Sequence, residues 1–155
     1  MDLMRKVMMM VDSREGLRGF SLTALRIAAG LGYFSHGAQK LFGWFGGFGP
    51  DGGSAPLMSE FGAAGVIESA AGALIVLGLF TRPAAFIASG EMAVTYFWKH
   101  WARAGDMWWW DNGGEIVMVY SFLWLFFAVW GAGPFSLDAW WKARRGTAAA
   151  HDPAI

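Results

Sequence analysis

The stretch FSLTALRIAAGLGYFSHGAQKL, residues 20–41, decides the fold. It matches the roughly 20 residues that a helix needs to cross about 30 Å of hydrocarbon. Within it stand three ionisable residues, Arg26, His36 and Lys40. Because charged groups at that depth are costly, we expect them to face the interior of a bundle, where they are paired and functional. The stretch therefore predicts a transmembrane helix with a polar inner face.

One face of this helix carries its unusual residues. At about 100° per residue, the same side holds Arg26, Gly30, Tyr33, Gly37 and Lys40. Glycines on that side let a neighbouring helix approach closely. Lys40 lies near the helix end and has an alternative role, in which its amine simply reaches the lipid headgroups. The rest of the chain is expected to supply partners for this face.

The composition is that of a membrane protein. Of 155 residues, 55% are hydrophobic, 15% are charged and 10 are Trp, a residue that collects at bilayer interfaces. The formal net charge is zero and no run of Lys or Arg could follow a phosphate backbone, which argues against a nucleic-acid partner. The chain has no cysteine, which excludes disulfides, dithiol redox chemistry and thiolate metal sites.

Three further apolar stretches follow the first, at residues 61–80, 83–98 and 114–131. Four such stretches in so short a chain leave too little polar sequence to cover the buried helices of a soluble protein. We therefore expect an all-α fold, a polytopic membrane protein with a bundle of four transmembrane helices. The Gly- and Pro-rich residues 43–60 and the Trp-rich residues 102–113 are expected to be loops at the membrane surface.

Lys and Arg residues predict the orientation in the membrane. Eight of them lie in the two terminal segments and the 81–83 turn, and two, Lys99 and Arg103, lie in the loops of the opposite side. The positive-inside rule then places both termini in the cytoplasm, in a multi-pass protein of the inner (cytoplasmic) membrane.

Three regions follow from this topology. Residues 1–19 form a cytoplasmic segment, either a short amphipathic helix on the membrane surface or a loose tail. Residues 20–141 form the four-helix transmembrane domain, and residues 142–155 form a cytoplasmic tail.

Several charges are expected to share the outer half of the bundle. At about 1.5 Å of rise per residue, Lys40, Glu115, His36 and Glu68 lie outward of the membrane centre, and Glu91 lies near it. An unpaired charge there would cost several kcal/mol. We therefore expect Lys40, Glu68 and Glu115 to lie within ion-pair or one-water distance of one another.

Arg26 lies alone in the inner half, and its partner stays open between Glu91 and backbone carbonyls freed by glycine. The whole network has two interpretations. It is either purely architectural, fixing the order of the helices, or it forms a polar pocket beneath the Gly-rich loop that binds a quinone, another small molecule or protons.

Under the second interpretation the residues take separate roles. The expected ligand-binding residues are Arg26, Tyr33, Lys40, Glu91 and Glu115. Two-electron reduction of a quinone takes up two protons, and His36 and Glu68 are the expected catalytic pair, since imidazole titrates nearest neutral pH. A haem between His36 and His100 has no supporting pattern around His100, and no metal site is expected.

Four segments of the chain together resemble the DoxX family. They are Arg26 with GLGYFSHGAQKLFG (residues 30–43), IESAAGALIVLGLFTRPAA (67–85), NGGE (112–115) and GAGPFSLD (131–138). The resemblance covers about residues 25–138 and implies a small four-helix bacterial membrane protein. Members of the family are often labelled oxidoreductases; some resemble the membrane subunit of a thiosulfate:quinone oxidoreductase, and others accompany redox or detoxification partners. Because this chain lacks cysteine, thiol chemistry of any member does not carry over.

The expected function is a quinone-linked or accessory subunit of a membrane redox system, that is, a membrane oxidoreductase subunit with no intrinsic cofactor and quinone as its ligand. Two alternatives stay open: a structural subunit whose aromatic surface docks onto a larger membrane complex, and a small carrier that uses the buried charges. The expected partners are the lipid bilayer and either other membrane subunits or further copies of this chain.

Overall fold

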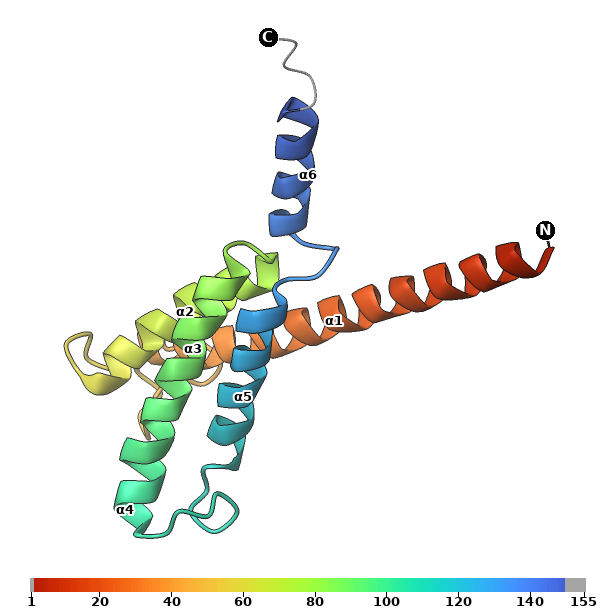
Figure 1. Cartoon of the computed structure of the whole chain (residues 1–155). Coiled ribbons are helices and arrows are strands. Elements are labelled where there is room, and N and C mark those ends of the chain that lie inside the picture. The colour runs from red at the N-terminus through yellow and green to blue at the C-terminus, as the bar shows by residue number, and fades with distance from the viewer. Residues whose placement is uncertain (1, 150–155) are drawn as a thin grey trace.

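The described part of the chain is helical and contains no β-strand. The computed structural model describes residues 2–149, and it describes side chains for residues 13–145. Its elements are α1 (Asp2–Phe42), α2 (Glu60–Leu77), α3 (Thr81–Thr95), the π-helix η1 (Tyr96–Trp101), α4 (Ala102–Ala104), α5 (Glu115–Trp130) and α6 (Leu137–Ala149), as Figure 1 shows. The all-α prediction is confirmed for these residues, and the last part of the predicted tail, residues 150–155, lies outside them.

The long helices form two antiparallel pairs. α1 packs along α2, α3 packs along α5, and the two pairs meet through α2 and α3 (Figure 1). The first part of α1 extends beyond this bundle, and α6 also projects away from it. The core lies where the pairs meet and centres on Tyr33, Ile75, Trp124 and Phe127, which are almost completely buried.

The two regions predicted to flank the bundle are helical. Residues 2–42 form one continuous helix, so the segment before residue 20 runs directly into the first predicted span. Gly19 lies inside this helix and makes room for the linker between α5 and α6, because a Cβ there would come within 2.6 Å of Pro134 Cγ. All of the described residues of the predicted tail, 142–149, belong to α6.

Each of the four predicted spans coincides with a helix, but the helices differ in how well they suit a membrane. Among the described residues, α2 alone is both long and apolar enough to cross one by length and composition. The apolar helix α5 has only 16 residues. α3 has 15 and continues through η1. By length and composition, α2 is therefore the predicted span that the described structure supports most directly.

Glycines bring α1 and α2 into backbone contact, as the sequence predicts. A Cβ on Gly37 would lie 2.4 Å from the backbone nitrogen of Ser69, and one on Gly72 would lie 2.8 Å from the backbone of Phe34. No real side chain tolerates such distances, so any larger residue forces the helices apart. Gly37 is thus a packing residue between two helices.

Arg26 connects three parts of the chain. Its guanidinium donates to Ile75 O (2.5 Å) and Val76 O (2.5 Å) near the end of α2, and to two carbonyls of the linker between α5 and α6, Ala132 O (3.0 Å) and Phe135 O (2.8 Å). The last carbonyls of a helix have no partner within the helix. Of the two partners left open by the sequence, Arg26 therefore takes backbone carbonyls and not Glu91.

Asp138 fastens the same linker to the start of α3. Its carboxylate accepts hydrogen bonds from the backbone of Phe80 (2.9 Å) and Thr81 (3.0 Å), and its own N–H donates to Gly78 O (2.8 Å). Phe80 has a φ of 47°, a left-handed conformation that is unusual for a residue with a side chain. The carboxylate thus stabilises a strained turn and caps a helix whose own N-cap residue offers no side-chain acceptor.

We expect Arg26→Met to destabilise the protein by about 3–5 kcal/mol, because four carbonyls, all buried or partly buried, lose a charged donor at once. Thermal unfolding of purified protein in detergent measures the effect. Arg103→Met, which removes the same charge from an exposed position on α4, is the control and should change little. An unchanged melting temperature for Arg26→Met would contradict the connecting role.

Candidate functional site

A groove with a cavity volume of about 350 Å³ lies between α2 and α3. It is lined by Lys40, Glu60, Phe61, Ala63, Ala64, Ile67, Glu68, Ile87, Gly90, Glu91, Val94, Thr95, Trp98 and Lys99. We call it the α2–α3 groove. Lys40 is the single lining residue from α1, so most of the wall comes from the two facing helices.

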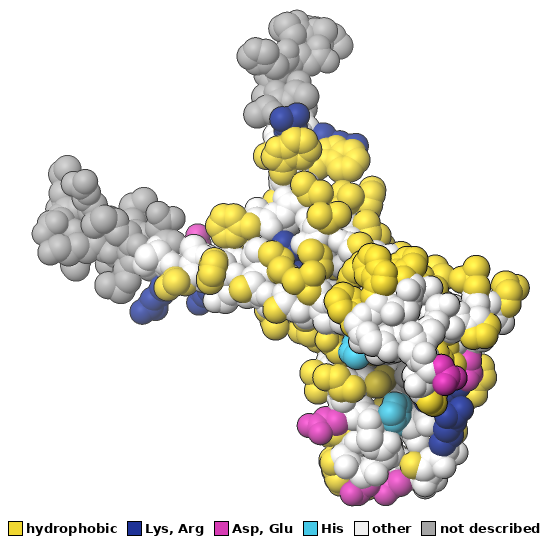
Figure 2. All heavy atoms as spheres, turned by 180° about the vertical axis from the view of Figure 1, so that it is seen from behind, with side chains coloured by type: hydrophobic (Ala, Val, Ile, Leu, Met, Phe, Trp, Pro, Cys, Tyr) yellow, Lys and Arg dark blue, Asp and Glu magenta, His cyan; other side chains and the backbone are white. Residues whose placement is uncertain are grey.

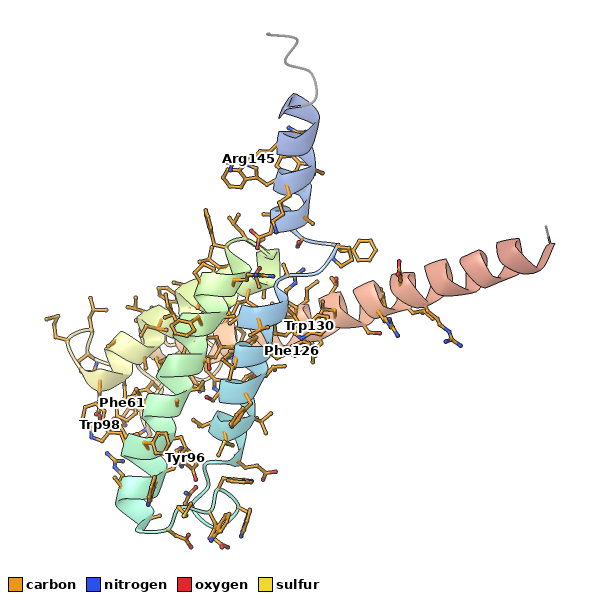
Figure 3. The ribbon with its side chains drawn as sticks, in the orientation of Figure 1. Phe61, Tyr96, Trp98, Phe126, Trp130 and Arg145 are labelled. Atoms are coloured by element: carbon orange, nitrogen blue, oxygen red, sulfur yellow. The ribbon has the colours of Figure 1, made fainter. Side chains whose placement is uncertain are left out.

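The rim of the α2–α3 groove is apolar and exposed. Ile87, Val94 and Trp98 line it, and each has more than half of its side chain exposed, with Trp98 at 63%. Figure 3 shows Phe61 and Trp98 close together where α2 approaches η1. The groove therefore opens sideways onto the apolar outer surface of the helices, and not beneath the Gly-rich loop as the sequence predicts.

The floor of the groove holds an ion pair. Lys40 Nζ lies 2.7 Å from Glu68 Oε1 and 2.5 Å from Glu68 Oε2, so the ammonium group bridges both carboxylate oxygens. Glu68 is 3% exposed. A buried carboxylate is tolerated only with such a partner. The predicted pairing of Lys40 with Glu68 is confirmed.

A second carboxylate, that of Glu91, lies on the same floor with neutral partners. Tyr33 Oη donates to Glu91 Oε2 (3.0 Å), and Thr95 Oγ1 donates to Glu91 Oε1 (3.0 Å). Glu91 and Thr95 are four residues apart, so they share one face of α3. The floor thus combines two carboxylates with one ammonium group, an arrangement that suits a ligand offering hydrogen-bond donors, or a proton.

Helical spacing brings these residues together. Tyr33 and Lys40 are seven residues apart on α1 and therefore point to the same side. Tyr33 lies beneath the groove, among the rings of Tyr120 and Trp124 at 5.9 and 5.3 Å between centroids. It supports Glu91 from below and does not itself line the groove.

One end of the groove is closed by a second ion pair, which sequence reasoning missed. Lys99 on η1 pairs with Glu60 at the start of α2, and its ammonium group lies 4.9 Å from the centroid of the Phe61 ring. A π-helix adds a residue to the turn and changes the direction in which side chains point. The one sequence signal that could have indicated the ion pair with Glu60 is that Lys99 directly follows the apolar stretch 83–98.

Four of the predicted site residues do not line the groove: Tyr33, which lies beneath it, and His36, Arg26 and Glu115. His36 is exposed on α1, one turn before Lys40. Arg26 is buried in the linker network described above. Glu115 is exposed at the start of α5, and among the described residues it forms no ion pair with Lys40, so of the predicted three-residue cluster the structure shows the pair of Lys40 with Glu68.

The loop after η1 is held by its own hydrogen bonds. Tyr96 Oη donates to Met107 O, and Asn112 donates from its side chain to Asp106 O (3.0 Å) and accepts from Gly114 N (2.8 Å). His100 Nδ1 lies 3.1 Å from Asn112 O. The NGGE segment therefore orders this loop, and among residues 13–145 no group of three or more His, Asp or Glu side chains could hold a metal ion.

Comparison with known proteins identifies the family of the chain. The DoxX family profile matches residues 21–101. An uncharacterized protein of Haemophilus influenzae is 40% identical over 133 residues, which cover 83% of this chain and 96% of that relative. No solved structure matches the chain significantly. The profile match includes the residues of the groove floor.

Replacing Lys40 by Met should destabilise the protein by about 2–4 kcal/mol, because Glu68 then remains buried without its counter-charge. Adding Glu68→Gln to Lys40→Met should recover a large part of that loss. Denaturant unfolding in mixed micelles measures the double-mutant cycle. The matched control is Lys99→Met, whose partner Glu60 is partly exposed and which should cost less than about 1 kcal/mol. Equal losses at the two lysines would argue against a special pair in the groove.

Proposed function

Because the chain belongs to the DoxX family, a family of membrane proteins, we propose that it binds a quinone in the α2–α3 groove and serves a membrane redox system. A membrane location follows from the family. The observation that carries the quinone proposal is the groove itself, which opens between two helices onto an apolar surface and has charged groups on its floor.

The proposed arrangement is a multi-pass protein of the inner membrane in which α1, α2, α3 with η1, and α5 cross as a four-helix bundle. Exposed hydrophobic side chains on these helices support it, since they would contact lipid. Figure 2 shows Lys and Arg on the described start of α1 and on α6, and most of the visible Asp and Glu at the opposite end. This distribution favours cytoplasmic termini.

A quinone suits both parts of the groove. Ligand sites of about 300–1,000 Å³ usually combine apolar walls with a few polar groups, and this one has about 350 Å³. An isoprenoid quinone is dissolved in the bilayer and would enter sideways, past Val94 and Trp98. Its carbonyl oxygens accept hydrogen bonds, for which the ammonium group of Lys40 is the donor on the floor.

Reduction of the quinone takes up two electrons and two protons and gives a quinol. In this proposal Glu68 and Glu91 each take up one proton that comes from the surface and pass it to one of the two ring oxygens, and the quinol hydroxyls then donate to the carboxylates that remain. His36, exposed one turn from Lys40, returns protons to the floor from the surface. The electrons come from a partner subunit that carries a flavin or metal centre.

Purified protein should retain a quinone that mass spectrometry of its lipid extract detects. Lys40→Met should weaken the binding of a short-chain quinone about tenfold, because one charged hydrogen bond to the ligand is lost. Glu68→Gln should lower quinone-dependent turnover about a hundredfold, the usual contribution of a general acid or base. His36→Phe should slow turnover without weakening binding.

Glu15→Gln, an isosteric change at an exposed position of α1, is the matched control for this series and should behave as the native protein. Wild-type affinity in Lys40→Met, or an extract without quinone together with no binding of the short-chain analogue, would rule out the groove as a quinone site.

A second candidate function, docking onto a larger membrane complex, is favoured by the Trp-rich loop. Trp108 and Trp110 are 45% and 57% exposed, and their rings stack at 4.8 Å between centroids. The hydrogen bonds of Tyr96 and Asn112 hold the loop beside them. Rigid exposed aromatic residues are the side chains that most often dominate binding between proteins.

Under the docking function, replacing Trp108, Trp109 and Trp110 together by Ala should release partner subunits during purification in mild detergent, and Glu68→Gln should leave them bound. The measurement is the set of proteins that co-purify, compared by mass spectrometry. Retention of the same partners by the triple variant would exclude this surface as the docking site.

A further inference from the structure

A second cavity lies at the other end of the bundle, where the α2–α3 turn meets the linker between α5 and α6. Its volume is about 310 Å³, and a smaller cavity of about 190 Å³ adjoins it. Both are lined by Phe80, Asp138 and Lys142; the larger adds Thr81, Arg82 and Trp130, and the smaller adds Trp141 and Arg145. We call the two together the basic cavity.

The cations of the basic cavity outnumber its carboxylates. Within the described residues, neither Arg82 nor Lys142 forms an ion pair. The one carboxylate present, that of Asp138, already accepts two backbone N–H groups and also interacts electrostatically with Arg26. Arg145, on α6 in Figure 3, stacks on Trp141 at 4.9 Å. The cavity therefore has an excess of positive charge available to an anion.

A buried hydroxyl without a partner lines the same cavity. Thr81 is 0% exposed, and its Oγ1 has no hydrogen-bond partner among the described residues. Burying a hydroxyl unpaired costs about 1–3 kcal/mol, and such groups are rare in folded proteins. An oxygen acceptor supplied by a ligand would satisfy this hydroxyl.

The position of the cavity along α2 indicates which anion it meets. In the proposed membrane arrangement α2 crosses the bilayer, so its end at Leu77 places the 78–82 turn at the level of the lipid headgroups. Exposed aromatic rings surround the cavity, Phe80, Trp130 and Trp141. Aromatic belts occur at this level, next to the phosphates and the glycerol of the lipid.

We propose that the basic cavity binds the phosphodiester headgroup of an anionic phospholipid. Arg82 and Lys142 contact the phosphate oxygens, Thr81 donates its hydroxyl to one of them, and the aromatic rings contact the glycerol and the first methylenes of the acyl chains. The site is at the opposite end of α2 from the quinone groove and does not depend on that function.

The test compares three ligands added to the full chain purified in detergent: phosphatidylglycerol, phosphatidylcholine and inorganic phosphate. Thermal unfolding and native mass spectrometry report binding. Phosphatidylglycerol should raise the melting temperature and stay bound, phosphatidylcholine should do neither, and inorganic phosphate should have little effect because it lacks an apolar part. An equal effect of the two lipids, or of phosphate alone, would overturn the proposal.

Variants then locate the site. Arg82→Gln and Lys142→Gln should each weaken binding of phosphatidylglycerol about fivefold, whereas Arg103→Gln, the same change at an exposed position, should not. Thr81→Val should lose part of the phosphatidylglycerol effect while its melting temperature in phosphatidylcholine stays equal or rises, since an unpaired hydroxyl is removed. Phosphatidylglycerol binding at the native level in all three variants would exclude the cavity.

Discussion

The hydrogen bonds of Arg26 are the interaction on which the rest of the structure depends. One guanidinium on α1 binds carbonyls at the end of α2 and in the linker after α5, and thereby holds the two helix pairs together at one end. Gly78 allows this approach, because a Cβ there would lie 3.0 Å from Arg26 Nη1. A fully buried cation without a carboxylate in direct contact is tolerated here because helix-end carbonyls carry partial negative charge.

The α2–α3 groove forms because the hydrogen bonds of Arg26 hold the helices together at one end only. α2 and α3 are joined by a tight turn at the Arg26 end, where Asp138 caps α3. Away from this turn stand Ala63, Ala64 and Gly90, which are too small to fill the space between two helices. The ion pair of Lys99 with Glu60 then closes the far end. The groove thus results from small residues on α2 and α3, which lie between the turn at one end and the ion pair at the other.

The sequence predicts the helices and the pairing of Lys40 with Glu68, because hydropathy and helical rise determine the depth of each charge in the bundle. It does not predict which side of a helix faces which neighbour. Glu115 and His36 have a suitable depth but lie on exposed faces, so they stay outside the groove. The sequence does not decide between backbone carbonyls and Glu91 as the partner of Arg26, because every residue has a backbone carbonyl and no pattern of residue types marks the ones that bind.

The charges on the groove floor constrain what chemistry it supports. Lys40 compensates Glu68, whereas among the described residues the hydrogen-bond partners of Glu91 are the hydroxyls of Tyr33 and Thr95. In an apolar setting two carboxylates and one ammonium group leave one negative charge that a proton or a donor group must balance. A ligand that gains hydroxyl groups when it is reduced supplies such donors. Under the proposed function, this imbalance would couple binding of the reduced quinone to the proton content of the floor.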